Sequence, residues 1–156
     1  MLAVAIPDLG DLELRHLVLD YNGTLAVDGR LIAGVREALT ALSSQVEIHV
    51  VTADTFGGAG SELAGLPLKI TIIPAEAQAD AKLAYVQELG AEHVCAIGNG
   101  RNDRKMLAVA AVGIAVAQRE GGSAEALAAA AVVTIDILDA LDLLRNPTRL
   151  IATLRS

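Results

Sequence analysis

The chain has 156 residues, with 12 Lys and Arg against 19 Asp and Glu, which gives a formal net charge of −7. Because nucleic-acid-binding proteins usually carry a basic patch, this acidic balance argues against a nucleic-acid partner. Hydrophobic residues make up 53% of the chain, which excludes a disordered protein and provides enough apolar surface for a core. We therefore predict one globular domain over residues 1–156.

The sequence gives no sign of a membrane or of an oxidising compartment. The single cysteine, Cys95, excludes an internal disulfide framework. Fully apolar runs stay well below the ~18 residues of a membrane span. Residues 2–6 are apolar, but they lack a basic flank and meet Pro7 and Asp8, so we expect no signal peptide. A soluble, cytoplasmic protein without a membrane partner is the expectation.

Short apolar runs alternate with helical segments along the chain. Residues 2–6 and 11–15 flank a Pro-Asp-Leu-Gly turn, which predicts an N-terminal β-hairpin. Six compact runs predict strands buried on both faces of a parallel sheet: 16–19, 46–51, 68–73, 94–97, 112–116 and 132–135. Helical spacing or composition predicts helices at 35–42, 83–89, 106–111, 124–131 and 137–144, and after Pro147.

Strands that alternate with helices predict an α/β fold, a doubly wound, Rossmann-like parallel sheet with helices on both faces. In such folds, ligands bind beyond the carboxyl ends of the strands, at the point where the strand order reverses. The polar residues that follow the strands are therefore the candidates for a functional site.

Three predicted strands end in polar residues, and a lysine lies on a helix between them. Asp20 follows the first strand, Thr52 ends the second, and the Gly-rich acidic turn 98–103 follows the fourth. Lys82 lies on the preceding helix, on a face that we predict to be separate from its apolar stripe. A carboxylate, a hydroxyl, an ammonium group and a second acidic turn together suit a phosphate and a divalent cation. Mg²⁺ fits best, because it prefers oxygen ligands.

Four segments, in this order, resemble the motifs of the haloacid dehalogenase superfamily of phosphohydrolases, and most closely those of the phosphorylation domain of P-type ATPases. D-Y-N-G-T-L at 20–25 is similar to D-K-T-G-T-L, and T-A-D at 52–54 to T-G-D. K-L-A-Y-V-Q-E-L at 82–89 resembles the lysine helix, and G-N-G-R-N-D at 98–103 is similar to G-D-G-x-N-D. Four ordered motifs in matching context are far more specific than any one alone.

The resemblance implies a role for each matching residue. Asp20 would be the nucleophile that forms an aspartyl-phosphate, and Thr52 and Lys82 would bind the phosphoryl group and neutralise its charge. Gly23 and Thr24 would shape the turn after the nucleophile. Asn102 would contribute to phosphate binding.

The same resemblance implies a Mg²⁺ site made of Asp20, the backbone carbonyl of Asn22, and Asp103 or Asn99. Two positions depart from the family pattern. Asn22 stands where phosphatases of the superfamily carry an acid that works as general acid and base, and an amide cannot transfer protons in that way. Asn99 replaces the first acid of the G-D-G turn, which lowers the charge available to the metal.

These features predict a Mg²⁺-dependent phosphohydrolase or phosphotransferase that acts on a small phosphate ester or anhydride. A catalytically weak or inactive module that binds Mg²⁺ and phosphate for regulation is the alternative, because of Asn22 and Asn99. The gaps of 27 residues between Thr24 and Thr52 and of 29 between Thr52 and Lys82 leave no room for a cap domain. We also expect a homo-oligomer, with the apolar C-terminal residues 150, 151 and 154 available to a partner.

The remaining polar candidates have local interpretations. Asp54 belongs to the T-A-D motif, but capping the next helix is an equally good role for it. His16, His49 and His93 are far apart in the sequence and show no ligand spacing, so we interpret them as structural or surface residues. Cys95 lies inside an apolar strand, which predicts an inert core thiol.

Overall fold

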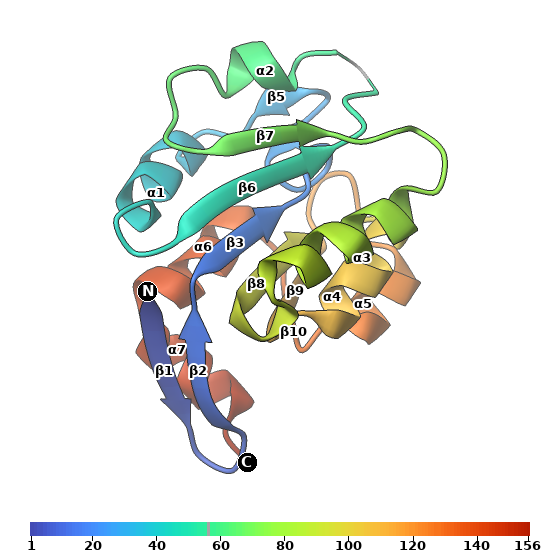
Figure 1. Cartoon of the computed structure of the whole chain (residues 1–156). Helices are drawn as coiled ribbons and strands as arrows, with labels where there is room; N and C mark the ends of the chain where they lie inside the picture. The colour runs from blue at the N-terminus through green and yellow to red at the C-terminus, as the bar shows by residue number, and fades with distance from the viewer. Residues whose placement is uncertain (56) are drawn as a thin grey trace.

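A six-stranded parallel sheet forms the centre of the molecule (Figure 1). The computed structural model describes residues 1–55 and 57–156. The strand order is β10-β9-β8-β3-β6-β7. The strands span β3 (His16–Leu19), β6 (Glu47–Thr52), β7 (Lys69–Ile72), β8 (Val94–Gly98), β9 (Val112–Val116) and β10 (Val132–Thr134). The chain first builds β3, β6 and β7 on one side and then returns to β8 on the other, so the order reverses between β3 and β8. This arrangement confirms the predicted doubly wound sheet.

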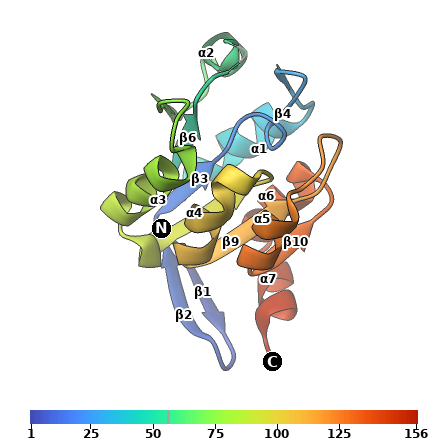
Figure 2. The ribbon, with the colours of Figure 1, turned by 90° about the vertical axis from the view of Figure 1, so that its right-hand side faces the viewer.

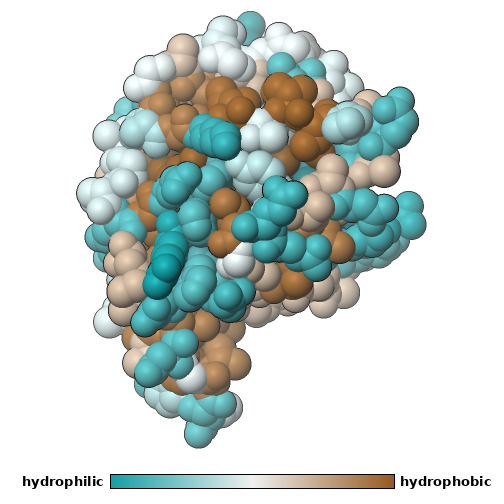
Figure 3. Space-filling view, in the orientation of Figure 1, coloured by the Kyte–Doolittle hydropathy of each residue, from teal (hydrophilic) through white to brown (hydrophobic). Residues whose placement is uncertain are grey.

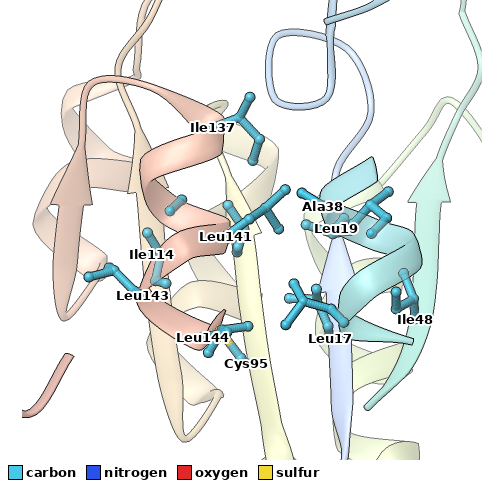
Figure 4. Packing of buried hydrophobic residues seen from close by; sticks show 14 of the residues in the cluster. Leu17, Leu19, Ala38, Ile48, Cys95, Ile114, Ile137, Leu141, Leu143 and Leu144 are labelled. Atoms are coloured by element: carbon cyan, nitrogen blue, oxygen red, sulfur yellow. The ribbon is translucent and has the colours of Figure 1, made fainter. Parts of the chain in front are cut away.

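Helices cover both faces of the sheet (Figure 2). One face carries α3 (Gln78–Leu89), α4 (Arg104–Val109) and α5 (Ala124–Ala129), and the other carries α1 (Val35–Leu42) and α6 (Ile137–Arg145). Figure 4 shows apolar side chains of α1 and α6 meeting Leu17, Leu19 and Cys95 of the sheet. Two clusters of buried residues, one on each face, hold the layers together. Burial of this kind stabilises by roughly 25 cal/mol per Å² of apolar surface.

The predicted N-terminal hairpin is present as β1 (Leu2–Ile6) and β2 (Gly10–Leu14), paired antiparallel. It extends beyond the sheet and packs against α7 (Pro147–Leu154), and Leu150 of that helix is fully buried there. Ile151 and Leu154 also lie against the core. The apolar C-terminal face is thus covered by the chain itself. The expected homo-oligomer loses this support and stays a prediction.

Three sequence expectations need correction. Both outer strands are partly exposed, with Ile72 of β7 at 57% and Val133 of β10 at 47%, because a strand at the edge of a sheet has a neighbour on one side only. Figure 3 shows apolar residues gathered on the surface over β7. The strand expected to reach Ile135 ends at Thr134, and Ile135 is 78% exposed. A second hairpin of β4 (Ala26–Val27) and β5 (Arg30–Leu31) was missed.

The turn of that second hairpin is Asp28-Gly29, and both residues have positive φ angles, 51° and 78°. A two-residue Asp-Gly loop is a strong hairpin signal, because its backbone twist matches that of the strands. The sequence therefore contained the information. Along the described residues, no helix combines the length and apolar character needed to cross a bilayer, and no further domain is inserted between the strands.

Candidate functional site

Asp20 lies directly beyond β3, where the strand order reverses. Its backbone N–H donates to the carbonyl of Ile97 on β8 at 3.0 Å, which extends the sheet by one residue and fixes the backbone of Asp20. The side chain is 9% exposed. Gly23 follows with a φ of +81°, and a Cβ at this position would collide with the side chain of Asn99. The turn therefore requires glycine for two independent reasons.

Lys82 joins two buried carboxylates. Its Nζ donates to Oδ1 of Asp20 at 2.8 Å and to Oδ1 of Asp103 at 2.7 Å, and its side chain is 1% exposed. Burial by itself lowers the pKa of an ammonium group, but the charges of Asp20 and Asp103 outweigh it, so the pKa of Lys82 lies above its ordinary value. The lysine is thus a fixed positive charge beside the candidate nucleophile.

The position of Lys82 corrects one expectation. The buried residues of α3 are Lys82 and Val86, one turn apart, while Leu83 is half-buried and lies outside the core cluster. Lys82 therefore shares the inward face of the helix instead of lying apart from it. Its long apolar stem packs with the core, and its charged end reaches the carboxylates.

Asp103 lies below the site and is held by the backbone around it. It ends a short 3₁₀ helix, η2 (Arg101–Asp103), and is completely buried. Its Oδ2 accepts N–H groups from Asn99 at 3.0 Å and Gly100 at 2.9 Å. Burial and the neighbouring charge of Asp20 raise the pKa of Asp103, although Lys82 opposes them. Because both carboxylate oxygens have partners, Asp103 is best placed to anchor Lys82 and the turn.

Thr24 and Asn99 connect the two sides of the site. The Thr24 hydroxyl lies 3.0 Å from Oδ2 of Asp20 and 3.1 Å from Oδ1 of Asn99, so its one hydrogen is shared between two acceptors. The Asn99 amide also donates to the carbonyl of Gly121 at 3.1 Å. The amide oxygen of Asn99 is thereby held toward Asp20.

A pocket of about 230 Å³ opens above these groups. Five predicted site residues contribute to its lining: Asp20, Asn22, Thr52, Asn99 and Asn102. The other predicted site residues contact these lining residues, as described above: Lys82, Asp103, Thr24 and Gly23. The structure therefore brings together every residue that the sequence nominated for the site. Oxygen atoms dominate this donor set, which fits Mg²⁺.

The side-chain oxygen of Asn22 is a buried acceptor for which the described residues supply no donor. Such an unpaired group costs about 1–3 kcal/mol, so it marks a position where a ligand can complete the hydrogen bonding. Thr52 is 2% exposed, and its hydroxyl accepts the backbone N–H of Asp54 at 3.0 Å. That bond leaves the Thr52 hydroxyl hydrogen free to donate into the pocket.

Two glutamines support the site and were missed. The Gln118 amide donates to the carbonyls of Gly23 at 3.1 Å and Thr24 at 2.7 Å, and its oxygen accepts the N–H of Ile137. Gln118 thus ties the turn after Asp20 to the start of α6. Gln78, the first residue of α3, accepts from Asn102 at 2.8 Å and lines the pocket. Single amides carry no periodic signal, so only tertiary structure reveals them.

Two further expectations can be compared with the structure. Asp54 is not the N-cap residue of α2 (Ala59–Glu62), which is Gly58, but its side chain caps the start of the helix, because its Oδ1 accepts the N–H groups of Gly58 and Ala59, both at 3.1 Å. The interpretation of the three histidines as structural or surface residues stays a prediction, but the structure brings two of them together. His16 and His49 meet on neighbouring strands, with 3.1 Å between His16 Nδ1 and His49 Nε2.

The fold and the site together define a class of α/β enzyme in which a carboxylate and a lysine meet beyond the central strands of a doubly wound sheet. Comparison with known families agrees. A model of haloacid dehalogenase-like hydrolases matches residues 77–138. An uncharacterized protein of Methanocaldococcus jannaschii is 44% identical over 79 residues, which are 48% of this chain and 85% of that protein. The chain belongs to the haloacid dehalogenase-like hydrolases.

A P-type ATPase is also similar over most of the chain. The probable copper-transporting ATPase of Arabidopsis thaliana is 35% identical over 153 residues, which are 90% of this chain but 15% of that protein. Solved structures share the fold at lower identity. The 3-deoxy-D-manno-octulosonate 8-phosphate phosphatase of Moraxella catarrhalis, in complex with magnesium and phosphate ions, has a TM-score of 0.69 and 18% identity, with 91% and 94% of the two chains covered. The cobalt-bound enzyme from Haemophilus influenzae has a TM-score of 0.68 and 14% identity, with 85% and 87% covered.

Proposed function

We propose that the protein is a Mg²⁺-dependent phosphohydrolase or phosphotransferase that works through an aspartyl-phosphate on Asp20. The observation that carries this proposal is the contact of Lys82 with both Asp20 and Asp103, at 2.8 and 2.7 Å, beneath a pocket at the point of strand reversal. One lysine neutralises only one of its two carboxylate partners. The site therefore keeps a negative charge that suits a cation, which in turn would allow an anion to bind.

The charges of the site support a requirement for a metal. Asp20 and Asp103 contribute −2 and Lys82 contributes +1, so the three buried groups sum to −1. A phosphate monoester dianion would bring the total to −3, which is costly beside two buried carboxylates. A divalent cation would return it to −1. When bound, Mg²⁺ supplies Lewis-acid polarisation of the phosphoryl oxygens.

Asp20, Asn22 and Asn99 line the pocket and would hold the cation, whereas Asp103 is completely buried below them and does not line it. We therefore infer that Asn99, and not Asp103, is the ligand from the 98–103 turn. Only one of these three ligands is a carboxylate, so Mg²⁺ would bind weakly and be exchangeable.

In the reaction that we propose, an oxygen of Asp20 attacks phosphorus and the bond to the leaving oxygen breaks. Lys82 orients the carboxylate through its 2.8 Å contact, and Thr52 donates its hydroxyl hydrogen to the phosphoryl group. Water protonates the leaving oxygen, because Asn22 has no proton to give. A second water then attacks the phosphorus of the aspartyl-phosphate, which releases inorganic phosphate and restores the carboxylate. A small phosphorylated compound, such as the sugar acid phosphate named for the structural neighbours, is the substrate class that we propose.

The test is hydrolysis of an aryl phosphate with Mg²⁺, together with acid-quench detection of phosphate bound covalently to the protein. Asp20→Asn should abolish both signals and keep the fold, because Asn retains the shape of the side chain. Activity that survives in Asp20→Asn would refute the assignment of the nucleophile.

The unpaired oxygen of Asn22 and the neutral Asn99 favour a second candidate, a module that binds Mg²⁺ and phosphate without turnover. Calorimetric titration with Mg²⁺ and orthovanadate, a phosphate analogue, would show binding in that case while a substrate panel gave no product. Covalent phosphate on Asp20 would rule out this candidate.

A further inference from the structure

Two histidines and a glutamate gather on the sheet at a place remote from the candidate active site. His16 is the first residue of β3, and Glu47 and His49 lie on the neighbouring strand β6. The parallel register pairs His16 with Glu47 and Val18 with His49. Because alternate residues of a strand face the same side, all three side chains project to the face covered by α3. Asp20 follows the opposite end of β3, about 13 Å away along the strand.

The separations within this cluster suit ligands of one metal ion. His16 Nδ1 and His49 Nε2 are 3.1 Å apart. The Glu47 carboxylate lies 3.4 Å from His49 Nε2 and 3.8 Å from His16 Nδ1. In a tetrahedral zinc site with bonds of 2.0–2.1 Å, neighbouring ligand atoms are about 3.3 Å apart. The two nitrogens are already near this spacing. Glu47 Oε1 lies near His49 and Oε2 near His16, so a small movement of the exposed carboxylate would complete one face of such a tetrahedron.

The surroundings of His49 orient its ring for ligation. Its Nδ1 lies 2.8 Å from the hydroxyl of Tyr85 on α3, and that hydroxyl is in turn 3.3 Å from Thr71 on β7. With Nδ1 engaged in this way, Nε2 is the nitrogen that faces His16 and Glu47. Hydrogen bonding of the second nitrogen is the usual support of a metal-bound histidine, because it fixes the tautomer and the ring plane.

One of the three side chains is buried and another is exposed to solvent. His49 is 2% exposed, so its ring is held in place by the sheet and by α3. The Glu47 side chain is 64% exposed. The cluster thus has a rigid, buried ligand and an accessible side through which an ion and a water molecule can enter.

We propose that His16, Glu47 and His49 form a site for a divalent transition-metal ion of the Zn²⁺ type, separate from the Mg²⁺ pocket at Asp20. Two imidazole nitrogens and one carboxylate suit Zn²⁺, whereas Mg²⁺ favours oxygen ligands throughout. The fourth position is left to water. Because the ligands come from both β3 and β6, the ion stabilises the pairing of two central strands.

The test is a titration of the untagged full chain with Zn²⁺ in excess Mg²⁺, in competition with a chromogenic chelator. We expect one Zn²⁺ per chain and a higher Tm in its presence. His16→Gln and Glu47→Gln should each weaken Zn²⁺ binding at least tenfold, and Tyr85→Phe should weaken it about 10–100-fold. Co²⁺ in place of Zn²⁺ should give the visible absorption of a four-coordinate ion in the wild type and not in Glu47→Gln.

The matched control is His93→Gln, which removes a histidine outside the cluster and should leave the affinity for Zn²⁺ unchanged. Asp20→Asn should also leave it unchanged, which separates this site from the pocket at Asp20. Glu47→Gln changes an exposed side chain, so its result does not depend on a fragile fold. Equal Zn²⁺ affinity in the wild type and Glu47→Gln, or loss of binding in Asp20→Asn, would overturn the proposal.

Discussion

Replacement of Lys82 by Met tests the arrangement of charges at the candidate site. Met keeps most of the volume and the apolar stem, so the core packing of α3 should survive. What is lost is the cation that lies 2.8 Å from Asp20 and 2.7 Å from Asp103. Removal of one partner from a buried ion pair typically costs about 3–5 kcal/mol, because the other charge stays buried and uncompensated.

Urea unfolding at pH 7, followed by circular dichroism, measures this loss. With an m value of about 2 kcal/mol per M, the midpoint of Lys82→Met should fall by about 2 M. Lys105→Met is the matched control, since Lys105 pairs with Asp80 on the exposed surface and its loss should leave the midpoint nearly unchanged.

The deficit of Lys82→Met should depend on pH in one direction. Without the lysine, which lowers it, the folded-state pKa of Asp103 rises further above that of the unfolded chain. The folded variant then binds more protons than the unfolded one over the pH range between these two pKa values, so acidification favours folding there. The pKa of Asp103 is already raised to about 6 in the wild type. The midpoint deficit should therefore shrink from pH 8 to pH 5. The charge assignment would be refuted if Lys82→Met unfolded at the same urea concentration as the wild type, or if the difference between their midpoints did not change with pH.

Three further predictions concern single positions. Asn22→Asp introduces a group able to transfer protons, so turnover at saturating Mg²⁺ should rise about tenfold, measured by steady-state kinetics, and slower turnover in a folded variant would contradict this. Burial raises the pKa of the Cys95 thiol to about 12, so a thiol-specific reagent at pH 8 should modify Cys95 only after unfolding, and rapid labelling of the native protein would be the contrary result. Asp54→Ala removes the cap of α2 and places alanine at a φ of 52°, so thermal unfolding should show a loss of about 1 kcal/mol, whereas Asp54→Asn, which keeps the acceptor and tolerates this backbone, should lose less.

The location of the site followed from the sequence because one rule links chain order to space. In a doubly wound sheet, the carboxyl ends of the strands meet at one edge. Asp20, Thr52 and Asn99 all follow or end strands, so their convergence needed only the correct strand assignment. The family motifs implied that Lys82 belongs to the site, but they did not imply that its side chain is buried. The pattern of apolar residues predicts only apolar residues on the inward face of a helix, so it did not predict a lysine there.

The cluster of His16, Glu47 and His49 was not predicted from the sequence, for a different reason. His16 and His49 are 33 residues apart, and they meet only because β3 and β6 pair in one particular register. A shift of one residue in this register would send His49 to the opposite face of the sheet. Periodicity locates a strand to within a few residues, which is too coarse to establish such a contact.

Under the proposed function, we expect short segments next to the pocket to select the substrate. The β4–β5 hairpin is the best-supported of these segments. The Tyr21 hydroxyl donates to the carbonyl of Gly29 at 2.8 Å, and Glu62 accepts the N–H of Leu31 at 3.1 Å. The hairpin is therefore held on both sides, and it borders a cavity of about 910 Å³ that also includes Gln118. Gln118 holds the turn after Asp20, so a group bound in this cavity would act directly on the residues that position Asp20.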